Sequence, residues 1–182
     1  MAIILHDIGK LQTCTMTDDG KITFLGHENA SSSIARKELQ KLRFSNDEIE
    51  YIDSLIKYHM MIHTIEMNDE RNRYDALAEL YIRLRENADL LIDIITFAKL
   101  DDNDKMNDYQ GLIDIVVSFE TMPRLIAGND VISYPDWIKG DLIKRMRYLQ
   151  LSKGLGKQEL LKYMKSEEHN IRENRKDENH DN

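Results

Sequence analysis

Apolar residues recur along most of the chain with the spacing of amphipathic helices. Ile49, Ile52 and Ile56 stand three and four residues apart, which places them on one helical face. Ser45 and Glu48 form a capping-box pattern, which predicts that this helix begins just after Ser45. Helical patterns cover residues 2–9, 27–43, 45–59, 73–87, 88–103, 108–122, 136–151 and 156–165. We therefore predict an all-α fold.

Four stretches lack this period. "TCTMTDDGKITFL" alternates in period two around Asp19-Gly20, which predicts a small β-hairpin. "MIHTIEMNDERN" is interpreted as a loop, and "LIAGNDVISYP" as an irregular connection. The fourth stretch, after residue 165, contains one aliphatic residue and cannot bury enough apolar surface to become ordered. These patterns predict a helical domain over 1–105, a C-terminal helical arm over 106–166 and a disordered tail over 167–182.

Charge is distributed unevenly along the chain. The net charge is −8, yet the segment 137–165 carries eight bases against two acids, so it is +6 and the remainder is −14. Such asymmetry is typical of a protein in which one part contacts a polyanion. A solvated basic helix surface explains the same pattern equally well.

Cysteine content and hydropathy restrict the class of protein. The single Cys14 excludes an internal disulfide framework and fits a reducing compartment. No apolar run approaches the ~20 residues of a membrane span, and the first residues do not resemble a signal peptide. We expect a cytoplasmic protein without membrane contact.

Ionisable side chains continue several of the apolar stripes. His59 follows Ile56 by three residues, so the two lie on one face of the helix. His27 likewise shares a face with apolar residues of its own helix. Asp101 continues the inner face of the helix over 88–103, and His6 and Asp7 follow two isoleucines. A single inward His is usually a hydrogen-bonded core residue, and Asp101 alone could lie on the surface. Several together can offset their burial by binding one cation, and mixed imidazole and carboxylate ligands suit transition metals better than calcium.

These residues stand in an ordered set of short motifs. "LHDIGK", "GHE" at residues 26–28, "YHM" at residues 58–60 and the later Asp101 resemble the HD superfamily of metal-dependent phosphohydrolases. More narrowly, they resemble the HD domain of bacterial tRNA nucleotidyltransferases, the CCA-adding enzymes. "LIAGNDVI", "GDLIKRMRYLQL" and "GKQELLKYM" resemble the C-terminal tRNA-contacting arm of the same family. The resemblance covers nearly all of residues 3–165.

The resemblance implies a fold, a set of metal ligands and a set of RNA contacts. The fold is an HD-type helical bundle with one small hairpin and a C-terminal helical arm. The expected cofactor is a divalent metal ion: Mn, Ni, Co, Fe or Zn, and also Mg. The implied metal ligands are His6, Asp7, His27, His59 and Asp101, with Asp102 as the alternative to Asp101 and His63 in reserve if its helix continues. The candidates for RNA contact are Lys144, Arg145, Arg147, Lys153 and Lys157.

Two residues of the first motif are candidates for catalysis. Asp7 could orient or deprotonate a water molecule, and Lys10 could neutralise a phosphate oxygen. For Lys10, a favourable interaction with a helix end is an equally good explanation.

Two functions remain open from the sequence, and a scaffold with a degenerate site is a third interpretation. The first is a phosphodiesterase or phosphatase acting on nucleotide or RNA phosphates. The second is a non-catalytic tRNA-binding module that works with a separate nucleotidyltransferase head. The chain lacks that family's catalytic head and the helix with a further metal-ligand His, so we do not expect nucleotidyl transfer by this chain alone. We also expect self-association or a partner at its N-terminal aliphatic residues.

Overall fold

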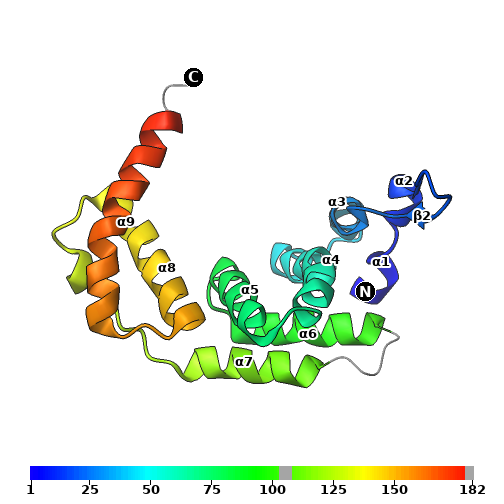
Figure 1. Ribbon diagram of the computed structural model, residues 1–182. Helices are drawn as coiled ribbons and strands as arrows, with labels where there is room; N and C mark the ends of the chain where they lie inside the picture. The colour runs from blue at the N-terminus through cyan, green and yellow to red at the C-terminus, as the bar shows by residue number, and fades with distance from the viewer. Residues whose placement is uncertain (103–107, 179–182) are drawn as a thin grey trace. The chain divides into compact units, whose positions relative to one another are not determined.

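The computed structural model describes residues 1–102 and 108–178, with side chains as far as residue 168. These residues are mostly helical and include a two-stranded hairpin (Figure 1), which confirms the predicted all-α class. The chain forms two compact units, each built from two stretches. Unit 1 comprises Met1–Asp69 and Ala88–Asp114, and unit 2 comprises Glu70–Asn87 and Ile115–Asn182. The predicted functional division into 1–105, 106–166 and 167–182 remains a prediction.

Unit 1 begins with two short helices and the hairpin. The helices are α1 (Ala2–Leu5) and α2 (Lys10–Thr13), and the strands are β1 (Thr15–Met16) and β2 (Ile22–Thr23). The strands are antiparallel, with Thr15 opposite Thr23, as the alternation around Asp19-Gly20 predicts. Gly9 does not end a longer helix through a left-handed residue, because its φ is −70°. It serves a packing role instead, because a Cβ here would lie 2.5 Å from the backbone of α3.

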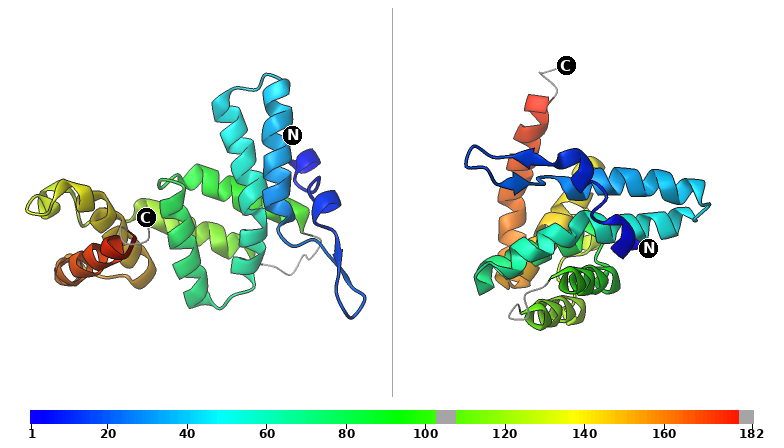
Figure 2. Two further views of the ribbon diagram at one scale, coloured as in Figure 1. Left: turned by 90° about the horizontal axis from the view of Figure 1, so that it is seen from above. Right: turned by 90° about the vertical axis from the view of Figure 1, so that its right-hand side faces the viewer.

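Two longer helices, α3 (His27–Lys41) and α4 (Asn46–Glu66), pack side by side in unit 1 (Figure 2). The predicted capping box is present, since Ser45 Oγ accepts from the Glu48 amide and the Glu48 carboxylate accepts from the Ser45 amide. The prediction of a loop from residue 61 is wrong, because α4 continues to Glu66. Ile62 and Ile65 are 0 % and 2 % exposed, so they extend the buried stripe by two turns.

Helix α6 (Ala88–Asp101) completes the core of unit 1 against α4. Its buried face is formed by Leu91, Ile94, Ile95 and Ala98, each fully buried. This face delivers Asp101, the last residue of the helix, to the site described below. Helix α7 (Tyr109–Thr121) begins in unit 1 and ends in unit 2.

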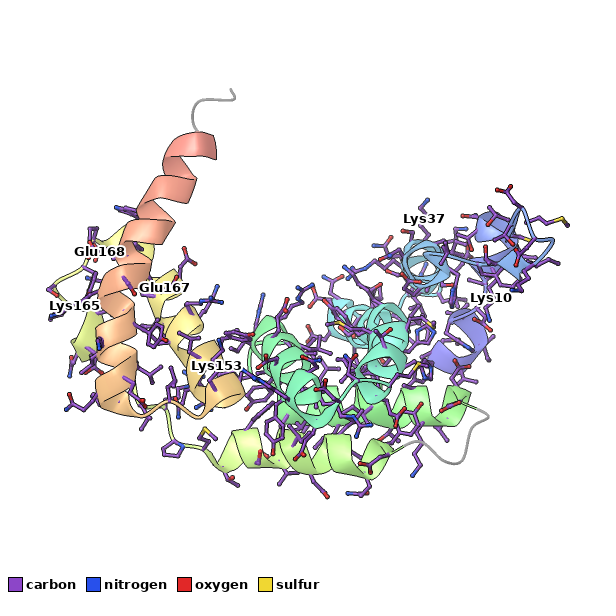
Figure 3. The ribbon with its side chains drawn as sticks, viewed as in Figure 1. Lys10, Lys37, Lys153, Lys165, Glu167 and Glu168 are labelled. Carbon is purple, nitrogen blue, oxygen red and sulfur yellow. The ribbon has the colours of Figure 1, made fainter. Side chains whose placement is uncertain are left out.

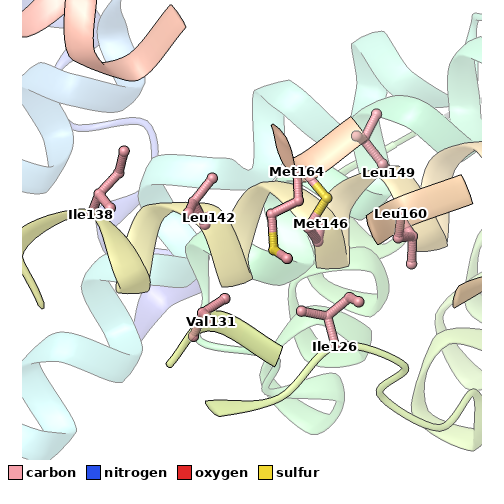
Figure 4. Packing of buried hydrophobic residues seen from close by; sticks show 8 residues of the cluster. All are labelled: Ile126, Val131, Ile138, Leu142, Met146, Leu149, Leu160 and Met164. Carbon is pink, nitrogen blue, oxygen red and sulfur yellow. The ribbon is translucent and has the colours of Figure 1, made fainter. Parts of the chain in front are cut away.

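Unit 2 contains α5 (Glu70–Arg83), the 3-10 helix η1 (Gly128–Val131), α8 (Asp136–Lys153) and α9 (Lys157–Glu178). Figure 4 shows its hydrophobic core between α8, α9 and η1. The core residues drawn there are Ile126, Val131, Ile138, Leu142, Met146, Leu149, Leu160 and Met164. The sequence predicts that the last helix ends at 165, whereas the backbone is helical to Glu178. This continuation lacks Gly and Pro and is rich in Glu, Lys and Arg, which favour helix without any buried surface.

Candidate metal centre and basic surface

The structure brings the five predicted ligands together in unit 1. His6 Nε2 lies 2.9 Å from Asp101 Oδ1 and 3.4 Å from Asp7 Oδ2. His27 Nε2 lies 3.5 Å from Asp7 Oδ1. The His59 ring centroid is 5.4 Å from that of His6 and 5.7 Å from that of His27. Residues almost a hundred positions apart in the sequence therefore form one cluster.

Each of the three imidazoles is held from behind by a main-chain carbonyl three residues earlier. His6 Nδ1 donates to Ile3 O at 2.9 Å, His27 Nδ1 to Phe24 O at 2.9 Å, and His59 Nδ1 to Ile56 O at 2.6 Å. A carbonyl oxygen only accepts, so Nδ1 carries the proton in all three rings. The neutral His59 ring then presents the lone pair of Nε2, whereas His6 Nε2 already lies at hydrogen-bond distance, 2.9 Å, from Asp101 Oδ1. Metal-ligating histidines are oriented in this way.

The spacing of the donor atoms resembles that of ligands around one ion. Two ligands bound at ~2.1 Å lie about 3.0 Å apart at a right angle and about 3.4 Å apart at the tetrahedral angle. The His6–Asp101, His6–Asp7 and His27–Asp7 distances fall in or close to that range. As the side chains stand, no group of three or more His, Cys, Asp and Glu residues in the described part of the chain is arranged to hold a metal ion. The cluster therefore offers correctly spaced pairs of donors.

Two polar atoms of the cluster are buried without a hydrogen-bond partner. They are His59 Nε2 and Asp7 Oδ1. His59 is fully buried. A buried nitrogen without a partner costs about 1–3 kcal/mol, so its retention in the core needs an explanation. A cation supplies one, because it would accept both the Nε2 lone pair and the carboxylate oxygen.

His63 joins the cluster because α4 continues past His59. His63 Nε2 lies 3.6 Å from Asp101 Oδ2. Its Nδ1 lies 3.0 Å from Tyr109 Oη, which itself donates to Asp102 Oδ2 at 2.7 Å. Tyr109 Oη has a single proton, so it accepts from His63, and His63 also presents an Nε2 lone pair. Asp101 thus contacts the cluster, whereas Asp102 supports it from behind.

Sequence reasoning missed Tyr109. Its position at the start of α7 carries no motif, and 46 residues separate it from His63. Only its hydrogen-bond partner, Asp102, stood out in the sequence, because Asp102 directly follows a candidate ligand.

Burial and charge set the protonation states of the site. Burial raises the pKa of Asp7, but the hydrogen bond from Lys10 and the charges of His6, Lys10 and His27 outweigh it, so the pKa lies below its usual value. Burial lowers the pKa of His59 more than its neighbours raise it. At neutral pH Asp7 is therefore a carboxylate and His59 a neutral imidazole, which are the forms that bind metals.

Lys10, at the start of α2 (Figure 3), neutralises part of the acidic charge of the site. Its Nζ donates to Asp7 Oδ2 at 2.7 Å and lies 5.8 Å from the centre of the Phe24 ring. The side chain is 38 % exposed, so it remains accessible to an incoming anion.

The predicted RNA contacts divide into exposed residues and one buried residue. Lys144, Arg145, Lys153 and Lys157 are exposed, and Figure 3 labels Lys153 near the end of α8. Lys157 lies 2.8 Å from Asp130 Oδ1.

Arg147 is 6 % exposed, and its contacts are internal. It donates to Glu86 at 3.1 Å and to the carbonyls of Phe119 and Met122 at 3.2 and 3.1 Å. Its contacts assign it to the framework of unit 2 rather than to an exposed face. The sequence could not show this, because the Glu86 partner lies 61 positions away.

Among the described residues no helix is long and apolar enough to cross a membrane. No protein-family model matches the chain, and no solved structure matches it. The chain is 32 % identical over 96 residues to the CC-adding tRNA nucleotidyltransferase of Thermus thermophilus. The match covers 52 % of this chain and 20 % of that enzyme. The chain is therefore related to a tRNA nucleotidyltransferase over about half its own length and spans about a fifth of the relative.

Proposed function

We propose that unit 1 carries the divalent-metal centre of an HD-type phosphohydrolase acting on nucleotide or RNA phosphates. The observation that carries this proposal is the fully buried His59, whose Nε2 has no partner and lies among imidazoles and carboxylates. Three histidines held through Nδ1 support it, because this arrangement leaves Nε2 as the ring nitrogen that faces the cluster.

The donor set favours a transition metal. Imidazole nitrogens and carboxylate oxygens together suit Mn, Fe, Co, Ni or Zn, whereas Mg is bound mainly by oxygen. His6, Asp7, His27, His59 and Asp101 would hold the ion, with His63 adjacent. In the structure, Asp101 approaches His6 directly at 2.9 Å, so binding requires these side chains to rearrange around the ion.

A bound metal would lower the pKa of a water molecule and polarise a phosphoryl oxygen. The chain's own residues would do the positioning. Asp7 is a weak base because its pKa is lowered, so it suits orienting a water molecule better than deprotonating it. Lys10 would leave Asp7 to bind a phosphate oxygen, since its ammonium group lies beside the cluster and its side chain is partly exposed.

Metal analysis of tag-free protein tests the site itself. The parent should retain a substantial fraction of one equivalent of a transition metal, and His27→Ala and Asp101→Ala should lose it. Asp89→Ala is the matched control, because Asp89 is exposed in the first turn of the same helix as Asp101. Equal metal content in the parent and the two ligand variants would refute the assignment.

Hydrolysis assays test the activity separately. Phosphomonoesters and 2′,3′-cyclic nucleotides should be hydrolysed slowly, with stimulation by Mn, Ni or Co. Asp7→Asn should abolish this hydrolysis while the protein keeps its fold by circular dichroism. Equal rates in Asp7→Asn and the parent would trace the activity to a contaminant.

A second candidate function is tRNA binding by unit 2. It is favoured by the match to a tRNA nucleotidyltransferase together with the +6 charge of 137–165, where Lys144, Arg145 and Lys153 are exposed. Affinity for tRNA should fall with salt by about 0.9 log unit per log unit of salt for each phosphate neutralised on duplex.

Charge-reversal variants test this binding. Replacing Lys144, Arg145 and Lys153 with Glu should abolish tRNA binding. The control replaces the exposed Lys37, Lys41 and Lys57 of unit 1 with Glu, which changes the net charge equally. If both triple variants lose the same affinity, binding reflects overall charge and the proposed surface is refuted.

A further inference from the structure

Unit 2 contains an acid–base cluster next to a cavity, in which Arg147 is buried and Arg124 is exposed. Glu86 is the centre of it, since its carboxylate accepts from Arg147 Nε at 3.1 Å and pairs with Arg124 Nη2 at 2.8 Å. Glu86 has a φ of +59°, a conformation that side-chain-bearing residues rarely adopt. Glycine would adopt this backbone conformation at a lower energetic cost. The backbone of Glu86 is therefore strained. In this conformation its carboxylate orients two guanidinium groups.

The cluster leaves positive charge unpaired. Arg124, Arg147 and Lys144 line the cavity with Glu86 as the one acid among its lining residues, which leaves a formal charge of +2. Arg147 is more than nine-tenths buried, and its Nη1 has no hydrogen-bond partner. A buried guanidinium N–H without an acceptor is costly, so the cavity calls for an acceptor atom with negative charge.

The dimensions of the cavity restrict what enters it. Its volume is about 30 Å³, which is room for about two oxygen atoms of a ligand. Lys144 also lines an adjoining open hollow of about 490 Å³, together with Arg145 and Tyr148. Glu79 and Asp141 line it as well, so this hollow has no net formal charge and suits an uncharged nucleoside rather than a phosphate. That volume is within the range of small-molecule sites, about 300–1,000 Å³. Arg145 lies 5.3 Å over the Tyr148 ring, which gives the hollow a flat cationic and aromatic wall.

We propose that these two hollows form a nucleotide-phosphate site. The phosphate oxygens enter the small cavity between Arg124, Lys144 and Arg147. The attached nucleoside lies in the open hollow against Tyr148 and Arg145. Arginine fits this role, because its planar donors bind phosphate oxygens in pairs. The identity of the physiological ligand rests on the proposed tRNA binding by unit 2. The inference adds a defined pocket to that basic surface.

Inorganic phosphate and AMP are the first probes, because they test the pocket without tRNA. Titration into isotopically labelled protein should shift the Arg147 side-chain NMR signals with a saturable curve. Lys144→Gln should weaken phosphate binding about tenfold, since it removes one charge-assisted hydrogen bond. Lys139→Gln is the matched control, because it removes the same charge from α8 but lies outside both hollows.

Tyr148→Leu separates the two hollows. It should weaken AMP binding about tenfold, since base stacking on an aromatic ring is lost, and leave inorganic phosphate binding unchanged. Circular dichroism and thermal melts would show that each variant keeps the parent fold. A variant that unfolds would be replaced by Tyr148→Phe, for which AMP affinity should match the parent.

The outcomes distinguish this site from the proposed tRNA binding. The pocket would be refuted if phosphate does not shift the Arg147 side-chain NMR signals. It would also be refuted if Lys144→Gln and Lys139→Gln bind phosphate with equal affinity, and water alone would then fill the cavity. If phosphate binds as expected and tRNA binds the parent and Lys144→Gln equally, the pocket holds and tRNA contacts the basic surface outside it. If phosphate and AMP bind as expected but tRNA does not, the pocket holds and its ligand is a free nucleotide.

Discussion

Gly9→Ala should disrupt the candidate metal centre without altering any ligand. A Cβ at Gly9 would lie 2.5 Å from His27 O and from Ser31 N, and 2.8 Å from Ala30 Cβ. Ordinary contacts begin near 3.4 Å. The segment carrying His6 would therefore have to move away from α3 by about 1 Å, because backbone atoms cannot yield as a flexible side chain does.

The energetic cost follows from two contributions. Overpacking costs about 1–3 kcal/mol. Displacement also breaks the buried hydrogen bond from Gly9 N to Ser31 Oγ, which is 2.9 Å long. Its loss adds about 1–3 kcal/mol, because both groups are left without partners. The total of about 2–6 kcal/mol is a large part of a typical stability of ~5–15 kcal/mol.

Urea unfolding and metal analysis of the same preparations measure both effects. Gly140→Ala is the control, because nothing lies within 4 Å of a Cβ added there. Gly140 is in the interior of α8, so alanine should stabilise the protein by about 0.5–1 kcal/mol. If Gly9→Ala retains the unfolding midpoint and the metal content of the parent, the close packing of Gly9 on α3 does not position His6.

Three further changes probe contacts that the structure adds. Tyr109→Phe should lower metal affinity by about tenfold, the lower end of the range for residues that orient a site, because His63 lies beside the ion and loses its hydrogen bond. Tyr51→Phe, which loses a hydrogen bond to an exposed carboxylate, should leave the affinity unchanged. Equal affinities of the two variants in metal competition would contradict this. Arg147→Met should destabilise the protein by about 1–3 kcal/mol, because the carbonyls of Phe119 and Met122 lose their buried donor while Glu86 keeps Arg124. Lys153→Met should change stability by less than about 0.5 kcal/mol. Chemical denaturation measures both, and similar small effects would show that Arg147 is not structural. Ile4→Ser should reduce self-association in sedimentation experiments because Ile4 is 75 % exposed, and a parent that is monomeric at all concentrations would remove the expected association.

Local features of the fold were predictable, because neighbouring residues determine them. The capping box at Ser45 and the hairpin turn at Asp19-Gly20 involve side chains and backbone within a few positions. The end of α4 was not predictable in this way. The polar residues after position 60 resemble a loop, yet Ile62 and Ile65 are buried once the chain has folded.

The same distinction applies to the candidate site. Periodicity placed His27, His59 and Asp101 on inner faces, because each shares a face with the apolar residues of its own helix. The pairing of His63 with Tyr109, and of Arg147 with Glu86, depends on which helices meet. Such pairings leave no trace in the spacing of residues along the chain. The sequence therefore indicated donors that face inward, but not the residues that orient them.

The placement of charge in the two units explains why one chain could combine both proposed activities. Unit 1 concentrates imidazoles and carboxylates around His59, which is buried without a partner for its Nε2. Unit 2 concentrates guanidinium and ammonium groups around Glu86, and Arg147 Nη1 is likewise buried without an acceptor. Each arrangement is unfavourable by itself, because desolvated donors and acceptors lose their hydrogen bonds to water. The two unpartnered atoms need ligands of opposite charge. A cation would bind the imidazole nitrogen in unit 1, and a phosphate would accept from the guanidinium group in unit 2. A nucleotide or RNA phosphate with a divalent metal ion supplies both, which is the physical reason to test unit 1 and unit 2 on the same RNA substrates.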